Sequence, residues 1–171
     1  MDLPQPKNLL DLNRVHHELA ELFDLHQAAL LKRDFNSCRS LWTEYKRHLL
    51  VHMREEEELL IPLYAARAAP IRGGGAELFS QEHAKIREWQ GRLELRISRL
   101  GAGTDAKDLI ALLDDEALYK KFIEHHSLRE DRILYPELER VVDPKERSGL
   151  LRLLTFSLEE DPRAPVQERP P

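Results

Sequence analysis

Cysteine is almost absent from the sequence: the single Cys38 cannot form an internal disulfide, which fits a reducing cytoplasm. No apolar run approaches the ~20 residues that a bilayer span needs, and residues 1–12 lack the basic start and apolar stretch of a secretory signal. Basic residues form no patch or stripe, and 26 Lys and Arg stand against 31 Asp and Glu, a net charge of -5. These absences predict a cytoplasmic protein that binds neither membrane nor nucleic acid.

Helix-breaking residues are few inside four long stretches of the chain, residues 8–33, 37–68, 76–100 and 105–141. Most of the ten prolines and seven glycines lie between or outside these stretches. Each stretch carries apolar residues at steps of three and four, the period of a helix that buries one face. A chain of 171 residues is long enough for one domain with a sizeable core. The sequence therefore predicts an all-α domain of four long helices.

The connections between the predicted helices indicate how the helices are arranged. Residues 33–36 and 101–105 form short connections, which favour antiparallel neighbours and hence an up-down four-helix bundle. The starts of the second and fourth helices agree with these limits, because residues whose side chains cap helix N-termini lie there. The candidates are Asp34, Asn36 or Ser37 for the second helix, and Thr104 or Asp105 for the fourth.

The C-terminal part differs in composition from the rest. Residues 144–158 have room for a short fifth helix, so we expect a domain spanning residues 1–158. Four prolines occur in residues 162–171. A segment of this kind cannot bury enough apolar surface to order itself, and we expect residues 159–171 to be a Pro-rich, disordered tail.

The predicted buried faces carry polar residues at one place on every helix. A buried carboxylate is unfavourable unless a cation or hydrogen bonds compensate it. Two carboxylates among four imidazoles on buried faces therefore indicate a metal site. The candidate ligands are His16 on the first helix, His52 and Glu56 on the second, His83 on the third, and His126 and Glu130 on the fourth.

An internal repeat supports this ligand set. Residues 45–62 align without gaps to residues 119–136, and both copies contain His-x-x-x-Glu. That spacing places an imidazole and a carboxylate on one face of a helix. The matched positions include Tyr45/Tyr119, His52/His126, Glu56/Glu130, Leu60/Leu134 and Pro62/Pro136.

The register of the predicted helices gives an independent test. In an antiparallel pair, residues at one height have numbers that sum to twice the turn position. The His–Glu pairs of the second and fourth helices have midpoints 54 and 128. His16 and 54 average 35, 54 and His83 average 68.5, and His83 and 128 average 105.5. Each average falls at or beside a predicted connection, so the six residues are expected at about one height.

The donor set indicates which metals fit. Four imidazoles and two carboxylates without a thiolate suit iron, manganese or zinc, and argue against an iron–sulfur cluster. Two carboxylates can bridge two ions, each of which also takes two imidazoles, and this leaves exchangeable positions for a small molecule. The alternative is a bundle with hydrogen-bonded core histidines, which does not explain two buried glutamates.

Several neighbouring residues have alternative interpretations. Asp131 is a rival to Glu130 as a ligand, although the repeat favours Glu130. His48 lies one turn, ~6 Å, from His52 and is either an extra ligand or a packing residue; its repeat partner Phe122 favours packing. His26 lies ~15 Å from His16 along the helix and is expected to be a core histidine. The remaining acidic residues of the second helix, Glu55, Glu57 and Glu58, are interpreted as a solvated face.

These residues resemble the hemerythrin family, specifically bacterial hemerythrin-like or HHE cation-binding domains, over about residues 8–141. The resemblance implies a four-helix bundle with two iron ions, bridged by carboxylates and an oxo or hydroxo group, with manganese or zinc as less favoured metals. By that pattern His16 and His83 are single ligands, and the two His–Glu pairs supply the others. Oxygen-carrying hemerythrins have a second histidine four residues after the third-helix histidine, where this chain has Arg87. That difference argues against simple reversible oxygen carriage.

The leading functional hypothesis is a non-haem di-iron protein that binds or senses oxygen, nitric oxide or peroxide. One alternative is a di-iron enzyme that reduces nitric oxide or peroxide, or that delivers iron for the repair of iron centres. Such an enzyme needs an electron-donor partner, because the chain has no flavin or nucleotide fingerprint. Another alternative is metal storage or a structural metal site. We place binding or sensing ahead of a dedicated enzyme.

Overall fold

The computed structural model describes residues 6–69 and 71–160. Within these ranges every regular element is helical and no strand occurs, which confirms the all-α prediction. In chain order the elements are the 3-10 turn η1 (Leu9–Leu12), α1 (Asn13–Leu31), α2 (Phe35–Glu55), the π-helical turn η2 (Glu56–Leu60), α3 (Ile61–Arg67), α4 (Ala76–Ser98), α5 (Ala106–Arg129), the π-helical turn η3 (Glu130–Leu134), α6 (Tyr135–Val141), α7 (Pro144–Leu151) and the 3-10 turn η4 (Leu158–Glu160).

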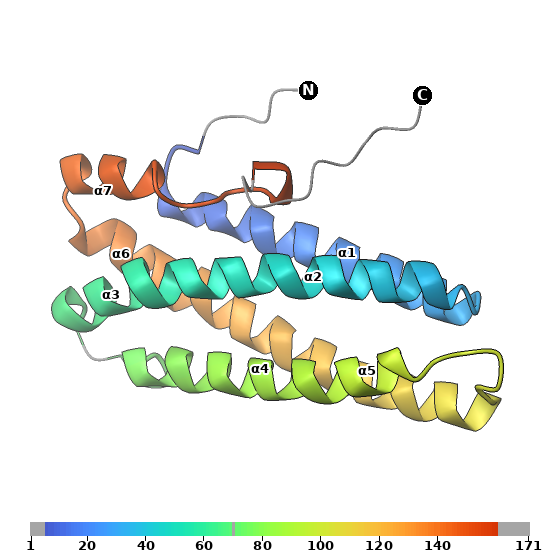
Figure 1. The fold of residues 1–171 in the computed structure, drawn as a ribbon. Coiled ribbons are helices and arrows are strands. Elements are labelled where there is room, and N and C mark those ends of the chain that lie inside the picture. The colour runs from blue at the N-terminus through green and yellow to red at the C-terminus, as the bar shows by residue number, and fades with distance from the viewer. Residues whose placement is uncertain (1–5, 70, 161–171) are drawn as a thin grey trace, which may run out of the picture.

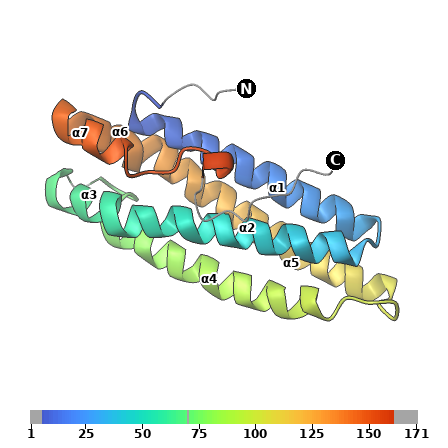
Figure 2. The ribbon, with the colours of Figure 1, turned by 45° about the horizontal axis from the view of Figure 1, so that its top comes forward.

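Four long helical runs lie side by side in Figures 1 and 2, because α2 continues through η2 into α3 and α5 continues through η3 into α6. Successive runs alternate in direction along the chain (Figure 1). Two of the predicted caps are confirmed: the Asp34 carboxylate accepts a hydrogen bond from the Ser37 amide, and that of Asp105 from the Asp108 amide. These caps satisfy amides that have no partner inside their own helix.

The fifth predicted helix is present but shorter than expected. α7 ends at Leu151 instead of continuing to residue 158, and residues 152–157 are not α-helical. Asp143 caps α7 through the Lys145 and Glu146 amides. Most of the predicted tail, residues 161–171, lies outside the described residues.

The segment after α7 packs back onto α1 and α2. The Glu55 carboxylate accepts hydrogen bonds from the Thr155 amide and hydroxyl, both at 2.9 Å. Glu18 in turn accepts bonds from the Ser157 hydroxyl and the Leu158 amide. The interpretation of Glu55 as part of a solvated face is therefore wrong, because its carboxylate anchors the C-terminal segment.

Apolar side chains form two separate clusters along the helices. One contains Phe23, Leu30, Trp42, Ile86, Leu93 and Tyr119 among others. The second contains Leu12, Leu60, Tyr64, Phe79, Leu138 and Phe156 among others. Burying a side chain of this size contributes about 1.5–3 kcal/mol. On α4, Phe79 belongs to one cluster and Ile86 to the other, with His83 between them. The predicted polar site thus lies where the two apolar clusters meet.

No helix of the described residues combines the length and the apolar character that crossing a bilayer requires.

Candidate metal centre

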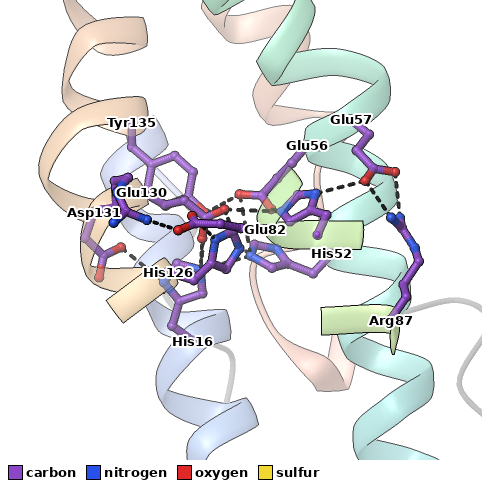
Figure 3. Close-up of polar contacts among 12 residues, drawn as sticks. His16, His52, Glu56, Glu57, Glu82, Arg87, His126, Glu130, Asp131 and Tyr135 are labelled. Carbon is purple, nitrogen blue, oxygen red and sulfur yellow. Dashed lines mark hydrogen bonds and ion pairs between the residues drawn. The ribbon is translucent and has the colours of Figure 1, made fainter. Parts of the chain in front are cut away.

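The structure brings all six predicted ligand residues together between the four helical runs (Figure 3). They come from four runs of helix: His16 from α1, His52 and Glu56 from α2 and η2, His83 from α4, and His126 and Glu130 from α5 and η3.

Both glutamates lie at the first position of a π-helical turn. Ile61 donates its amide to the Glu56 carbonyl, and Tyr135 donates its amide to the Glu130 carbonyl, each five residues back. Pro62 and Pro136 follow directly, and proline cannot donate the hydrogen bond of a regular helix and clashes with the preceding turn. The repeated proline thus accounts for a repeated widening of the helix, a feature often found at functional sites.

The donor atoms divide into two groups that share both carboxylates. One group contains His16, His52, Glu56 and Glu130, and the other contains Glu56, His83, His126 and Glu130; within each group the donor atoms lie within 4.8 Å of one another. Each group therefore offers two imidazoles and two carboxylates to one cation.

The closest pairs of donor atoms bring nitrogens and oxygens into contact across the site. His16 Nε2 lies 3.0 Å from His52 Nε2 and 3.2 Å from Glu130 Oε2. In the second group, His126 Nε2 lies 2.9 Å from Glu130 Oε1. His83 Nε2 lies 3.3 Å from Glu56 Oε2. These separations place the donor atoms around two common centres.

Carboxylates outside the site hold three of the imidazoles in place. The Nδ1 atoms of His16, His83 and His126 lie 3.2, 3.0 and 3.0 Å from carboxylate oxygens. Their partners are Asp131, Glu57 and Glu82 respectively. Because a carboxylate only accepts, Nδ1 carries a hydrogen, which leaves Nε2 as the ring nitrogen that is available to a metal. Such outer partners orient the histidines of metal sites.

Arginines complete two of these outer contacts. Arg87 donates two hydrogen bonds to Glu57, and Arg129 donates one to Glu82. The interpretation of Glu57 as a solvated carboxylate is therefore wrong, whereas Glu58 is exposed as expected. Glu82 was not predicted, because its contact with His126 joins two helices and leaves no signal within either one.

Asp131 and Glu130 occupy different places. Glu130 is fully buried among the donor atoms, whereas Asp131 is 31% exposed and contacts the outer nitrogen of His16. The structure thus places Glu130 in the donor cluster and Asp131 outside it.

Buried polar atoms without hydrogen-bond partners concentrate in this site. Among the described residues they include Glu56 Oε2, His83 Nε2 and both carboxylate oxygens of Glu130. Leaving such atoms without a partner is unfavourable in a buried environment. These four atoms of the site are all potential metal donors, so the residues present fit bound cations.

The charges of the site lead to the same conclusion. Burial alone would lower the pKa of His16, but Asp131 and Glu130 raise it to about 9. Burial likewise opposes protonation of His83 and His126, yet the neighbouring carboxylates raise their pKa values to about 9 and about 10. The carboxylates thus favour positive charge beside them, and in the metal-free chain protonated imidazoles supply that charge. Metal binding should displace those protons.

Tyr135 is a further residue that sequence reasoning did not connect with the site. Its hydroxyl donates a 2.6 Å hydrogen bond to Glu56 Oε1 (Figure 3). Burial and the charge of Glu56 hold the pKa of Tyr135 well above its usual value, so the metal-free chain keeps this proton. The repeat gave no signal for it, because Tyr135 corresponds to Ile61 in the first copy.

Two other histidines lie outside the donor groups. His48 is buried, its Nε2 lies 2.6 Å from an Arg47 nitrogen, and it belongs to neither group. His26 is fully buried, as predicted for a core histidine, with its two ring nitrogens next to the Cys38 carbonyl and the Glu116 carboxylate.

A cavity of about 210 Å³ reaches the site between α1, α2 and α5. Exposed residues such as His17 and Glu124 line one part of it, and the buried His52 and His126 line another. Its wall also includes Leu19, Phe23, Leu49 and Ile123. The cavity therefore connects the surface to the donor atoms along a largely apolar path.

The described residues form an all-helical fold in which two groups of imidazoles share two glutamates, and this arrangement is that of a metal-binding protein. The chain belongs to the hemerythrin family: the family model described as hemerythrin HHE cation binding domain matches residues 9–138. The match confirms the resemblance found in the sequence. No curated protein and no solved structure gives a significant match to the chain.

Proposed function

We propose that the chain is an up-down four-helix bundle with a non-haem di-iron centre that binds or senses oxygen, nitric oxide or peroxide. The observation that supports this most is the pair of donor groups that share Glu56 and Glu130. Three of the four oxygens of these carboxylates have no hydrogen bond of suitable geometry. The donor atoms are all nitrogen or oxygen, a set that suits iron, with manganese and zinc as less favoured metals.

The residues of the chain have separable roles in this proposal. His16 and His52 would hold one ion and His83 and His126 the other, with Glu56 and Glu130 common to both. Asp131, Glu57 and Glu82 fix the ring orientations. Bound iron would supply exchangeable coordination positions and reversible redox chemistry.

The cavity supports a small-molecule ligand. Its apolar walls favour uncharged molecules such as oxygen and nitric oxide over ions, and it touches His16, His52, His126 and Glu130 directly. Any catalytic reduction would need electrons from a donor protein. The cytoplasmic location stays a prediction from the sequence.

The proposal is tested by metal analysis combined with ligand exposure. We expect two irons per chain, and distinct spectral changes when the reduced protein meets oxygen, nitric oxide or hydrogen peroxide. His125→Ala, at an exposed position beside the site, is the matched control for His126→Ala, which should lose metal while staying helical.

Three other outcomes would change the proposal. Spectra and autoxidation unaffected by all three ligands would overturn the sensing role. Steady turnover with an electron donor would establish an enzyme instead. Bound metal that never reacts with oxygen would indicate storage or a structural site.

A further inference from the structure

The hydroxyl of Tyr135 lies among the donor atoms of one metal position. It is 2.6 Å from Glu56 Oε1, 3.3 Å from His16 Nε2 and 3.4 Å from His52 Nε2. The side chain is fully buried, and its ring stacks on His16 with centroids 5.8 Å apart. A simple hydrogen bond to Glu56 does not require the hydroxyl to approach both imidazole nitrogens.

The spacing of these atoms is that of ligands around a single ion. Donor atoms bound at ~2.0–2.2 Å from one cation lie about 3 Å apart. His16 Nε2 and His52 Nε2 are separated by 3.0 Å, and His16 Nε2 and Glu130 Oε2 by 3.2 Å. The distances from the Tyr135 oxygen to the two imidazole nitrogens, 3.3 and 3.4 Å, are only slightly longer. The phenol oxygen thus occupies a place at the edge of this donor group.

The second metal position has no corresponding oxygen from the repeat. The residue that matches Tyr135 is Ile61, which cannot ligate a metal. On α4, Arg87 lies one turn after His83, but both of its terminal nitrogens are bonded to Glu57. The two copies of the repeat therefore supply equal His–Glu pairs but differ at the position of Tyr135, which could add a metal ligand in one copy alone.

We propose that Tyr135 is a ligand of the ion held by His16 and His52, and that it makes the two metal positions inequivalent. This inference rests on the proposed metal centre. As the oxygen–metal bond forms, the phenol O–H bond breaks and its proton leaves to solvent. A bound cation stabilises the resulting phenolate, just as it deprotonates other coordinating groups.

The test compares Tyr135→Phe with Tyr64→Phe, which removes another buried hydroxyl that donates to the Gly74 carbonyl, away from the donor groups. Both variants and the wild type are loaded with ferric iron. We expect phenolate-to-iron charge-transfer absorption, with resonance-enhanced phenolate vibrations, in the wild type and in Tyr64→Phe. Tyr135→Phe should lose both signals while it retains two irons and its helical circular dichroism.

Zinc loading gives a second readout that does not depend on iron chemistry or on the folding of a variant. We expect one tyrosinate per wild-type chain in the near-ultraviolet difference spectrum on zinc binding. Two bound metals without a phenolate signal would overturn the Tyr135 assignment and leave the di-iron proposal intact. A wild-type chain that binds neither iron nor zinc would overturn both.

Discussion

Two buried clusters of histidine and glutamate occur among the described residues, and they differ in how the hydrogen-bonding capacity of their polar atoms is satisfied. In the first cluster, between α1 and α5, both nitrogens of His26 have partners: the Cys38 carbonyl at 2.9 Å and Glu116 Oε1 at 2.8 Å. The other Glu116 oxygen accepts a hydrogen bond from Gln27. In the second cluster, imidazole nitrogens lie 2.9–3.3 Å from the oxygens of Glu130 and from one oxygen of Glu56, but none of them forms a hydrogen bond of suitable geometry with these oxygens.

The comparison shows that residue type alone does not distinguish a structural pair from a ligand set. Histidine and glutamate occur at zero exposure in both clusters. A complete set of hydrogen bonds indicates a cluster that stabilises the fold by itself. Imidazole nitrogens and carboxylate oxygens that converge without well-oriented hydrogen bonds between them indicate a cluster that binds a cation.

Removing a carboxylate of the second cluster should have the largest effect. We expect Glu130→Ala to reduce metal affinity by more than about 100-fold, because even the outer partners of metal ligands contribute about 10–100-fold. Both metal positions should be affected, since Glu130 belongs to both donor groups. Metal content per chain measures the effect, and Glu116→Ala is the matched control that should keep its metal. Equal metal loss in both variants would show that the two clusters do not differ in their role in metal binding.

Glu116→Ala should instead destabilise the fold. It leaves His26 buried without its charged partner, and breaking a buried pair in this way costs about 3–5 kcal/mol. Chemical denaturation of the metal-loaded wild type and variant measures the difference. A change below about 1 kcal/mol, the range of an exposed ion pair, would contradict the structural role of this pair.

High pH should weaken the first cluster selectively. Burial alone would lower the pKa of His26, but hydrogen bonds with Cys38 and Glu116 raise it to about 10 from the ordinary 6.5. The folded state therefore holds this proton more tightly than the unfolded state. The resulting stability is fully present below pH 6.5 and is lost as the pH rises through 10.

Comparison with a variant isolates this contribution from the other histidines. The difference in unfolding free energy between the wild type and His26→Gln, both metal-loaded, should shrink as the pH rises from 7 to 10. A difference that stays constant over that range would show that His26 is neutral in the folded protein.

The smallest expected effect comes from the outer contacts of the metal centre. Glu82→Gln weakens the partner of His126 Nδ1 but leaves every donor in place. We expect a loss of about 10–100-fold in metal affinity. Glu88→Gln, an exposed carboxylate on the same helix, is the control and should have no effect. Unchanged affinity in Glu82→Gln would show that packing alone orients His126.

Local patterns in the sequence were sufficient for much of the fold. Apolar periodicity located the long helical runs, and capping residues placed two of their starts, because both depend on neighbours within a few positions. The predicted length of the fifth helix was wrong. Residues 152–157 leave the helix and bond to Glu55 and Glu18, which lie 100 and 139 or more positions away.

The sequence by itself determined which six residues meet. The His–Glu spacing, the repeat and the register of antiparallel helices place His16, His52, Glu56, His83, His126 and Glu130 at one height. Each of these signals is a spacing along the chain, and a helix places residues at a fixed spacing on one of its faces.

Only the tertiary structure decided what surrounds those six. In the folded chain Glu57 contacts His83, Asp131 contacts His16, and Tyr135 contacts Glu56. Such contacts join different helices, with 26, 115 and 79 positions between the partners. They depend on how each helix is rotated about its own axis relative to its neighbours, which no pattern along a single helix specifies.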